Sequence, residues 1–84
     1  MKTFNDLRFE KDELGTHARL NFPNDYGVSV VTGLGRYSDK EENTYELGIL
    51  FLNALCYSTE LGDDVMGWQT PEEITESMAF LQTL

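Results

Sequence analysis

Three stretches of the chain have the pattern of β-strands: the first alternates between apolar and polar positions, the second is rich in β-branched residues, and the third has one apolar side. They cover residues 16–22, 28–34 and 44–52. The third stretch is the longest, and its core side carries Tyr45, Leu47, Ile49 and Phe51. Its other side becomes apolar toward the far end, at Leu50 and Leu52. We therefore predict three strands from these stretches.

Turn-forming residues separate the predicted strands. Residues 23–27 have turn chemistry, with Gly27 free to adopt a positive φ. Residues 33–35 end the second strand or introduce a bulge. The Asn-Ala pair at 53–54 can reverse the chain into a fourth strand at residues 55–58, although alanine accepts a positive φ poorly. The sequence thus predicts a meander.

The C-terminal part of the chain carries the clearest signal, that of a helix. Thr70 can cap it, Pro71 suits its first position, and Glu73 completes a capping box with Thr70. The spacing i, i+4, i+7 predicts one buried stripe, formed by Ile74, Met78 and Leu81, with Leu84 at its edge. Phe80 lies at the margin of this stripe, where it is either a flank contact with the sheet or an exposed anchor for a partner.

Together these elements predict a single α+β domain over residues 1–84. It is an antiparallel β-meander of about four strands with one C-terminal helix packed on one face. A chain of 84 residues leaves no room for a second domain. With 40% hydrophobic residues it is too apolar for a disordered acidic tail, so we expect a folded, soluble, acidic protein.

Charge is divided unevenly along the chain, whose formal net charge is -9. Residues 1–40 carry six acidic and six basic side chains, which sum to zero, whereas residues 41–84 carry nine acidic side chains and no basic one. Two interpretations follow: a solvated surface that only confers solubility, or a negative face that meets a basic partner. Direct nucleic-acid binding is not expected, because it begins with phosphate neutralisation by Lys and Arg.

On the second interpretation, the negative face lies between residues 60 and 76. Six acidic side chains surround one tryptophan there, and the candidate binding residues are Glu60, Asp63, Asp64, Trp68, Glu72, Glu73 and Glu76. Trp68 is either the aromatic anchor of this face or a plug between helix and sheet.

The sequence does not indicate catalytic or metal chemistry. The single histidine, His17, lies on the polar side of a strand, where we expect it to be solvated. The adjacent acidic pairs at 63–64 and 72–73 point in different directions and do not converge as an acid/base pair. Glu60 with the 63–64 pair lacks the spacing of an EF-hand, and residues 33–35 lack the third glycine of a phosphate loop. We expect no enzyme, no cofactor and no metal.

Targeting signals are also missing from the pattern. No apolar run of signal-peptide kind follows Met1, and the longest apolar stretch, residues 49–52, is far below the roughly 20 residues that cross a bilayer. The single cysteine, Cys56, lies in a predicted strand with no basic neighbour, so we expect a buried or half-buried side chain rather than a reactive thiol. We therefore expect a cytoplasmic protein with no membrane partner.

Several segments together resemble a family of small tailed-bacteriophage proteins with no established activity. They are MKTFNDL at 1–7, YGVSVV at 26–31, YELGIL at 45–50, YST at 57–59, DDVMG at 63–67 and TPEEITE at 70–76. The resemblance covers most of the chain, although the family's expected Asn-Gly turn is Asn-Ala here. It implies expression in the cytoplasm of an infected bacterium and carries no catalytic residues.

Two functions from different classes fit these observations. The first is a non-enzymatic phage protein that binds a basic surface of a host protein through the negative face, as an inhibitor of a nucleic-acid-handling or defence protein. This chain is similar to known phage inhibitors of that kind in size and charge alone. The second is a structural or accessory module, with a homodimer formed through a sheet edge or through the apolar side of Leu50 and Leu52.

Overall fold

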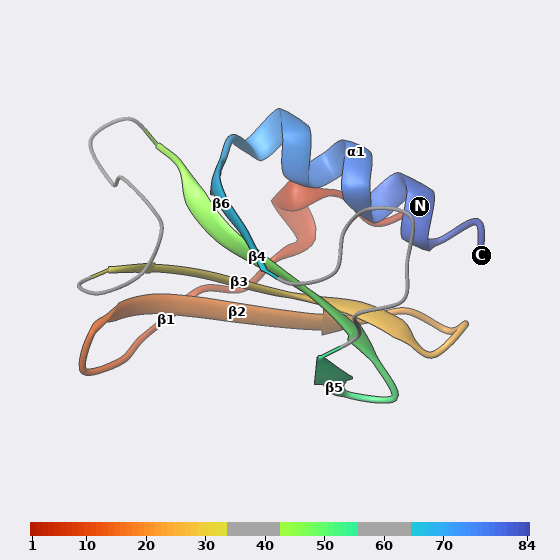
Figure 1. Cartoon of the computed structure of the whole chain (residues 1–84), viewed down its shortest axis with the longest axis horizontal. Coiled ribbons are helices and arrows are strands. Elements are labelled where there is room, and N and C mark those ends of the chain that lie inside the picture. The colour runs from red at the N-terminus through yellow and green to blue at the C-terminus, as the bar shows by residue number, and fades with distance from the viewer. Residues whose placement is uncertain (34–42, 56–64) are drawn as a thin grey trace.

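A curved antiparallel sheet packs under a single helix. The structure is a computed structural model and describes residues 1–33, 43–55 and 65–84. In chain order its elements are η1 (Phe4–Asp6), β1 (Glu10–Lys11), β2 (Gly15–Asn21), β3 (Tyr26–Gly33), β4 (Tyr45–Phe51), β5 (Ala54–Leu55), β6 (Met66–Gln69) and α1 (Pro71–Leu81) (Figure 1). The predicted α+β class is confirmed, with slightly more strands than the four expected.

The strands follow one another across the sheet in the order β1-β2-β3-β4-β5, and all pairs are antiparallel. Strand β6 also pairs with β4. The outer edge of β4 is therefore shared, because β6 pairs with its first half and β5 with its last two residues. Because α1 begins two residues after β6, the pairing of β6 with β4 places the start of the helix over the sheet.

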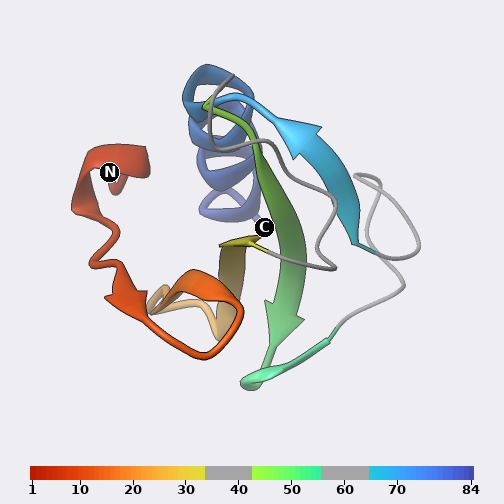
Figure 2. The ribbon, with the colours of Figure 1, turned by 90° about the vertical axis from the view of Figure 1, so that its left-hand side faces the viewer.

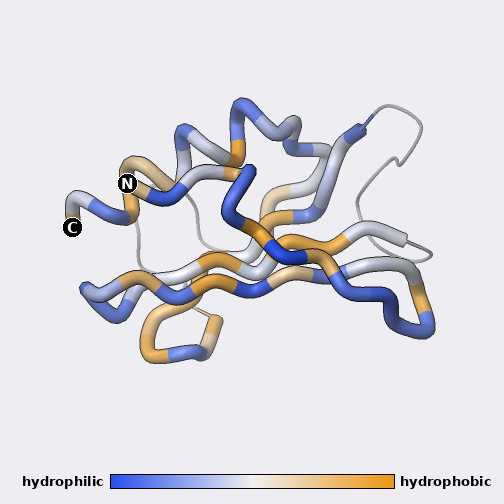
Figure 3. Tube along the Cα trace, turned by 180° about the vertical axis from the view of Figure 1, so that it is seen from behind, coloured by the Kyte–Doolittle hydropathy of each residue, from blue (hydrophilic) through white to orange (hydrophobic). Residues whose placement is uncertain are grey.

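The hydrophobic core lies between the sheet and α1. Ile74, Met78 and Leu81 are fully buried, which confirms the predicted stripe. They belong to one cluster with apolar side chains of the three long strands, among them Ala18, Val28, Val30, Leu47 and Ile49. The alternation of apolar and polar positions along these strands is visible in Figure 3. Seen end-on, α1 lies over the concave side of the sheet (Figure 2).

The turn between β2 and β3 differs from its prediction. Asp25, not Gly27, takes the positive φ, of 73°. Gly27 is already in β3, paired with Asn21, and a Cβ there would lie 2.6 Å from the backbone oxygen of Leu20. Gly27 is therefore needed for the close approach of β2 and β3 rather than for turn geometry.

The β4–β5 hairpin begins one residue earlier than expected. Phe51 pairs with Ala54, so the two loop residues are Leu52 and Asn53, with φ values of 52° and 66°. Two consecutive positive φ values define a type I′ turn, whose twist matches that of the flanking strands. Ala54 thus starts a strand instead of completing the turn, and Cys56 with the rest of the predicted fourth strand lies outside the described residues.

The sheet face opposite the helix is partly covered as well. Leu50 is fully buried, although it does not belong to the core cluster formed with α1. A Cβ on the neighbouring Gly48 would contact side-chain atoms of Leu55 and Val65, so these two side chains lie over this part of β4. The expected apolar surface at Leu50 and Leu52 is therefore corrected: only Leu52, which is 65% exposed, is on the surface.

Candidate functional site

The predicted binding residues fall into three groups. Glu72, Glu73 and Glu76 are exposed on the first two turns of α1. Trp68 is 58% exposed in β6. The remaining candidates lie outside the described residues; they are Glu60, Asp63 and Asp64.

The start of α1 uses one of the three glutamates for its own cap. The Thr70 hydroxyl accepts a hydrogen bond from the Glu73 backbone N–H at 3.2 Å, and the Glu73 carboxylate accepts one from the Thr70 N–H at 3.0 Å. This is the predicted capping box, with Pro71 at the first helical position. Because Glu73 is held at the helix start, Glu72 and Glu76 are the carboxylates left on an adjoining face.

Glu72 and Glu76 line a hollow of about 460 Å³ between η1 and the first half of α1. We call it the acidic groove; its lining is Phe4, Asn5, Pro71, Glu72, Thr75 and Glu76. The two carboxylates are one helical turn apart, so they share a face of α1. The sequence contains this i, i+4 signal, but nothing in it indicates that Phe4 and Asn5 form the opposite wall.

The wall opposite the helix is set by hydrogen bonds and aromatic packing. The Phe4 N–H donates to the Thr75 hydroxyl at 3.0 Å, which fixes η1 against α1. The Phe4 ring packs 5.7 Å from Phe9 and 5.2 Å from Tyr45, measured between ring centroids. Phe4 is therefore attached to both the helix and the sheet, and it positions Asn5 at the rim of the groove.

No basic side chain neutralises the groove within the described part of the chain. Among the described residues an ion pair joins His17 and Asp12, away from the groove, and none involves Glu72 or Glu76. Like charges at i and i+4 on a helix destabilise it by about 0.2–0.5 kcal/mol. The groove therefore carries a small electrostatic cost that a cation placed between the carboxylates would relieve.

Trp68 does not line this groove. Gly67 and Trp68 together lie opposite Glu46, because the β4–β6 register shifts between Tyr45 and Leu47. This bulge holds Trp68 at a φ of 51°. Strand β6 and η1 lie on opposite sides of α1 (Figure 2). Trp68 and the pair Glu72 and Glu76 are thus two separate exposed features rather than one continuous face.

His17 has a structural partner, contrary to the expectation that it is simply solvated. Its Nδ1 lies 2.7 Å from Oδ2 of Asp12. The other carboxylate oxygen of Asp12 accepts hydrogen bonds from the N–H groups of Leu14 and Gly15, both at 2.8 Å. Asp12 therefore closes the β1–β2 turn from both sides, and His17 braces it.

Metal sites and membrane-spanning helices are both absent from residues 1–33, 43–55 and 65–84. These ranges contain no group of three or more His, Cys, Asp or Glu side chains that could hold a metal ion. They also contain no helix that is long and apolar enough to span a membrane. The acidic groove combines a hollow with two carboxylates that form no ion pair within these ranges.

Comparisons with protein-family models, with curated proteins and with solved structures returned no match to this chain.

Proposed function

We propose that this protein is a non-enzymatic binding protein whose acidic groove receives a basic side chain from the surface of another protein. The observation that carries the proposal is the pair Glu72 and Glu76, exposed in a hollow with no neutralising cation among the described residues. A lysine or arginine between them would relieve their mutual repulsion and gain two charge-assisted contacts.

The charge distribution of the whole chain supports the same proposal. Residues 41–84 carry nine acidic side chains and no basic one, so a basic partner approaches this half under long-range attraction. Such steering weakens as salt rises, because the Debye length shortens. The complex should therefore form fastest and most tightly at low ionic strength.

The resemblance to small tailed-phage proteins narrows the class of partner. We propose a host protein with a basic surface, such as a nucleic-acid-handling or defence protein of an infected bacterium, which this protein would inhibit by occupying the surface that binds phosphates. Size and charge support this step by analogy. A host protein of this kind would be competed away by DNA, which makes the step testable once a partner is known.

A pair of double variants tests the groove. E72Q/E76Q removes the two groove charges, and E10Q/E13Q removes two exposed charges from the other half of the chain, so both variants carry a net charge of -9 + 2 = -7. Binding of a fluorescent nona-arginine peptide at low salt should weaken about fivefold or more for E72Q/E76Q and by no more than about twofold for E10Q/E13Q. Equal losses in the two variants would mean that only net charge matters.

The second candidate function, a homodimer, is favoured by one observation. Three large apolar side chains are exposed around the β4–β5 hairpin: Phe51, Leu52 and Leu55. The apolar character of this hairpin is visible in Figure 3. A dimer through it would be insensitive to salt and would be lost in L52S/L55S, whereas a basic hetero-complex would be sensitive to salt. Sedimentation at two salt concentrations separates the two functions.

A further inference from the structure

The N-terminal segment, residues 2–7, runs alongside α1 and forms one wall of the acidic groove; we call it the strap. Only Leu7 of the strap is buried, at 9% exposure, and Lys2, Asn5 and Asp6 are exposed. Phe4 and Leu7 attach the strap to the core, whereas its hydrogen bonds at Lys2 and Thr3 are exposed to solvent. Segments of this kind open locally at a lower free energy than the core does.

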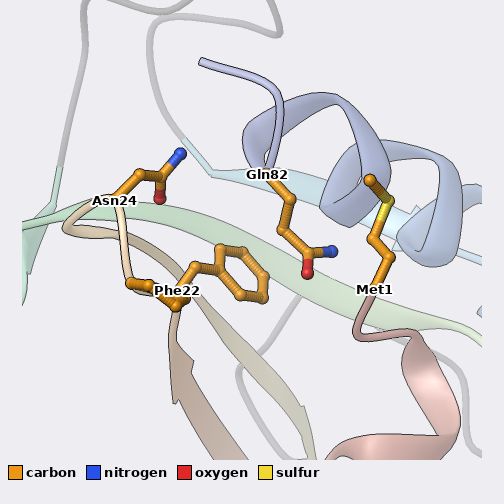
Figure 4. Close-up of a pocket in the computed structure, with 5 residues that line it drawn as sticks. Met1, Phe22, Asn24 and Gln82 are labelled. Carbon is orange, nitrogen blue, oxygen red and sulfur yellow. The ribbon is translucent and has the colours of Figure 1, made fainter.

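The contacts that seat the strap are concentrated at two places on α1. At the groove, the Phe4 N–H donates to Thr75. At the end of the helix, the side-chain amide of Gln82 binds both backbone groups of Lys2: its oxygen accepts from the Lys2 N–H and its nitrogen donates to the Lys2 carbonyl, each at 2.8 Å. Figure 4 shows the Gln82 amide reaching down between Phe22 and Met1. Gln82 thus pairs with Lys2 as a neighbouring strand would.

The strap is also held in shape from within. The Asp6 carboxylate accepts a hydrogen bond from the Thr3 N–H at 2.8 Å, and the Asp6 and Leu7 N–H groups donate to the carbonyls of Thr3 and Phe4. Asn5 lies in the resulting turn. When the strap is seated, this turn presents Phe4 and Asn5 to the groove, and when it leaves, that wall of the groove is lost.

We propose that the strap is a movable wall of the acidic groove, and that Gln82 controls the groove by clamping Lys2. This inference rests on the proposed function and concerns the regulation of the same site. Gln82 is ten residues from Glu72, which is about 15 Å along the helix, so it acts on the groove only through the strap. Because binding and seating are linked, a ligand in the groove stabilises the seated strap by the same factor by which seating strengthens binding.

Hydrogen exchange of the strap amides measures the linkage directly. In the intact protein, with nona-arginine at about ten times its Kd, exchange of the amides of Thr3, Phe4, Asp6 and Leu7 should slow about tenfold. In E72Q/E76Q at the same peptide concentration, exchange should slow far less. Exchange that is unchanged while the peptide occupies the groove of the intact protein would overturn the inference and leave the proposed function standing. Absence of any peptide binding would overturn the proposed function itself.

Variants at the clamp complete the test. Q82A removes both hydrogen bonds to Lys2 and should speed exchange of the strap amides about tenfold or more. T83A is the matched control, because the Thr83 hydroxyl donates to the Phe80 carbonyl at the same helix end rather than to the strap. Should Q82A keep the strap seated, Q82A/D6A also removes the Thr3 cap, with T83A/E13A as its control of equal net charge.

The affinity for nona-arginine should fall in the variant that unseats the strap and not in its control. A loss of at least threefold is expected once less than about one third of the molecules have the strap seated. If hydrogen exchange shows that the strap is unseated in a variant whose affinity for nona-arginine is unchanged, the strap is not a wall of the binding site. If neither clamp variant changes exchange, Gln82 does not seat the strap.

Discussion

Leu52 has a backbone conformation that leucine rarely adopts. Its φ of 52° places it in the left-handed region, where a Cβ costs about 1–2 kcal/mol, and its side chain is 65% exposed. Asparagine tolerates this region far better and is typical of type I′ turns. We therefore expect L52N to raise the free energy of unfolding by about 0.5–1 kcal/mol, measured by urea denaturation.

The matched control for this substitution is L14N, because Leu14 is 50% exposed and has no positive φ. It should change stability by no more than about 0.5 kcal/mol. Destabilisation by L52N would show that the leucine side chain packs usefully at the hairpin, in spite of its exposure.

Two glycines of the sheet should respond differently to alanine. Gly33 has a φ of 139°, and a Cβ there would overlap the Leu14 backbone oxygen, so G33A must push the start of β2 away from the end of β3. A Cβ on Gly48 would instead meet the end of the Leu55 side chain at 3.1 Å, which can move aside. We expect G33A to lower the free energy of unfolding by about 2 kcal/mol or more and G48A by less than about 1 kcal/mol. Thermal unfolding of the two variants side by side checks this.

Asp6 gives the strap a defined acid sensitivity. The hydrogen bond from the Thr3 N–H, helped by the nearby Lys2 charge, holds the pKa of the Asp6 carboxyl below its ordinary value. A carboxyl whose pKa is lower in the folded state adds stability above its unfolded pKa, and this stability is lost as pH falls through the folded pKa.

We therefore expect faster hydrogen exchange in the strap of D6A than in the strap of the unaltered chain near pH 6. The difference should disappear at a pH below the folded pKa of Asp6, where the unaltered chain has also lost the charge. A difference that persists unchanged in acid would assign the effect to packing of Asp6 rather than to its charge.

At the scale of elements, the turn before β3 also secures the end of the helix. The Asn24 side-chain amide donates to the carbonyls of Leu81 and Leu84, and its oxygen accepts from the Tyr26 N–H. The Leu81 carbonyl belongs to the last turn of α1, where it has no partner within the helix and also accepts from the Leu84 N–H at 3.3 Å. We expect N24A to lower the free energy of unfolding by about 1–2 kcal/mol. N24D retains only the bond from Tyr26, so it should lose part of this stability. If N24A is as stable as the unaltered chain, water replaces the lost hydrogen bonds.

The elements that could be predicted are those that carry their own periodic signal. The strands β2, β3 and β4 are seven or eight residues long and carry alternating or β-branched apolar residues, and α1 has a capping box and an apolar stripe. The strands β1 and β5 are two residues long, and β6 is four residues long with a bulge. Their pairing therefore depends on the free backbone edges of β2 and β4 rather than on the preferences of their own residues. The same limit explains why the sequence predicts the β4–β5 turn one residue later than the structure has it, at 53–54 instead of 52–53.

The candidate site divides in the same way. The capping box and the spacing of Glu72 and Glu76 are local, and the sequence contains both. The wall of the groove depends on the Phe4–Thr75 and Lys2–Gln82 contacts, which join residues 71 and 80 positions apart. Polar side chains carry no pattern for contacts at such separations. The strap therefore becomes visible only when the two ends of the chain are seen together.

At the scale of the whole molecule, salt should act in opposite directions on folding and on binding. The net charge of -9 arises in residues 41–84, so the folded state concentrates like charges that the unfolded chain separates. Raising NaCl from about 0.01 M to about 1 M shortens the Debye length from about 30 Å to about 3 Å. We expect the free energy of unfolding to rise by about 1 kcal/mol, or Tm by about 4–8 °C.

Salt has the opposite effect on the binding of a basic partner, because the same acidic side chains attract that partner. Over the same salt range the affinity for nona-arginine should fall steeply, because the attraction is screened. E72Q/E76Q should show a smaller salt gain in Tm and a shallower salt dependence of binding, since these two charges contribute to both effects. E10Q/E13Q should leave both slopes nearly unchanged, because its charges come from the balanced half of the chain. Stability that falls with salt would instead mean that attractive ion pairs hold the native state, and the uncompensated acidic half would then need another explanation.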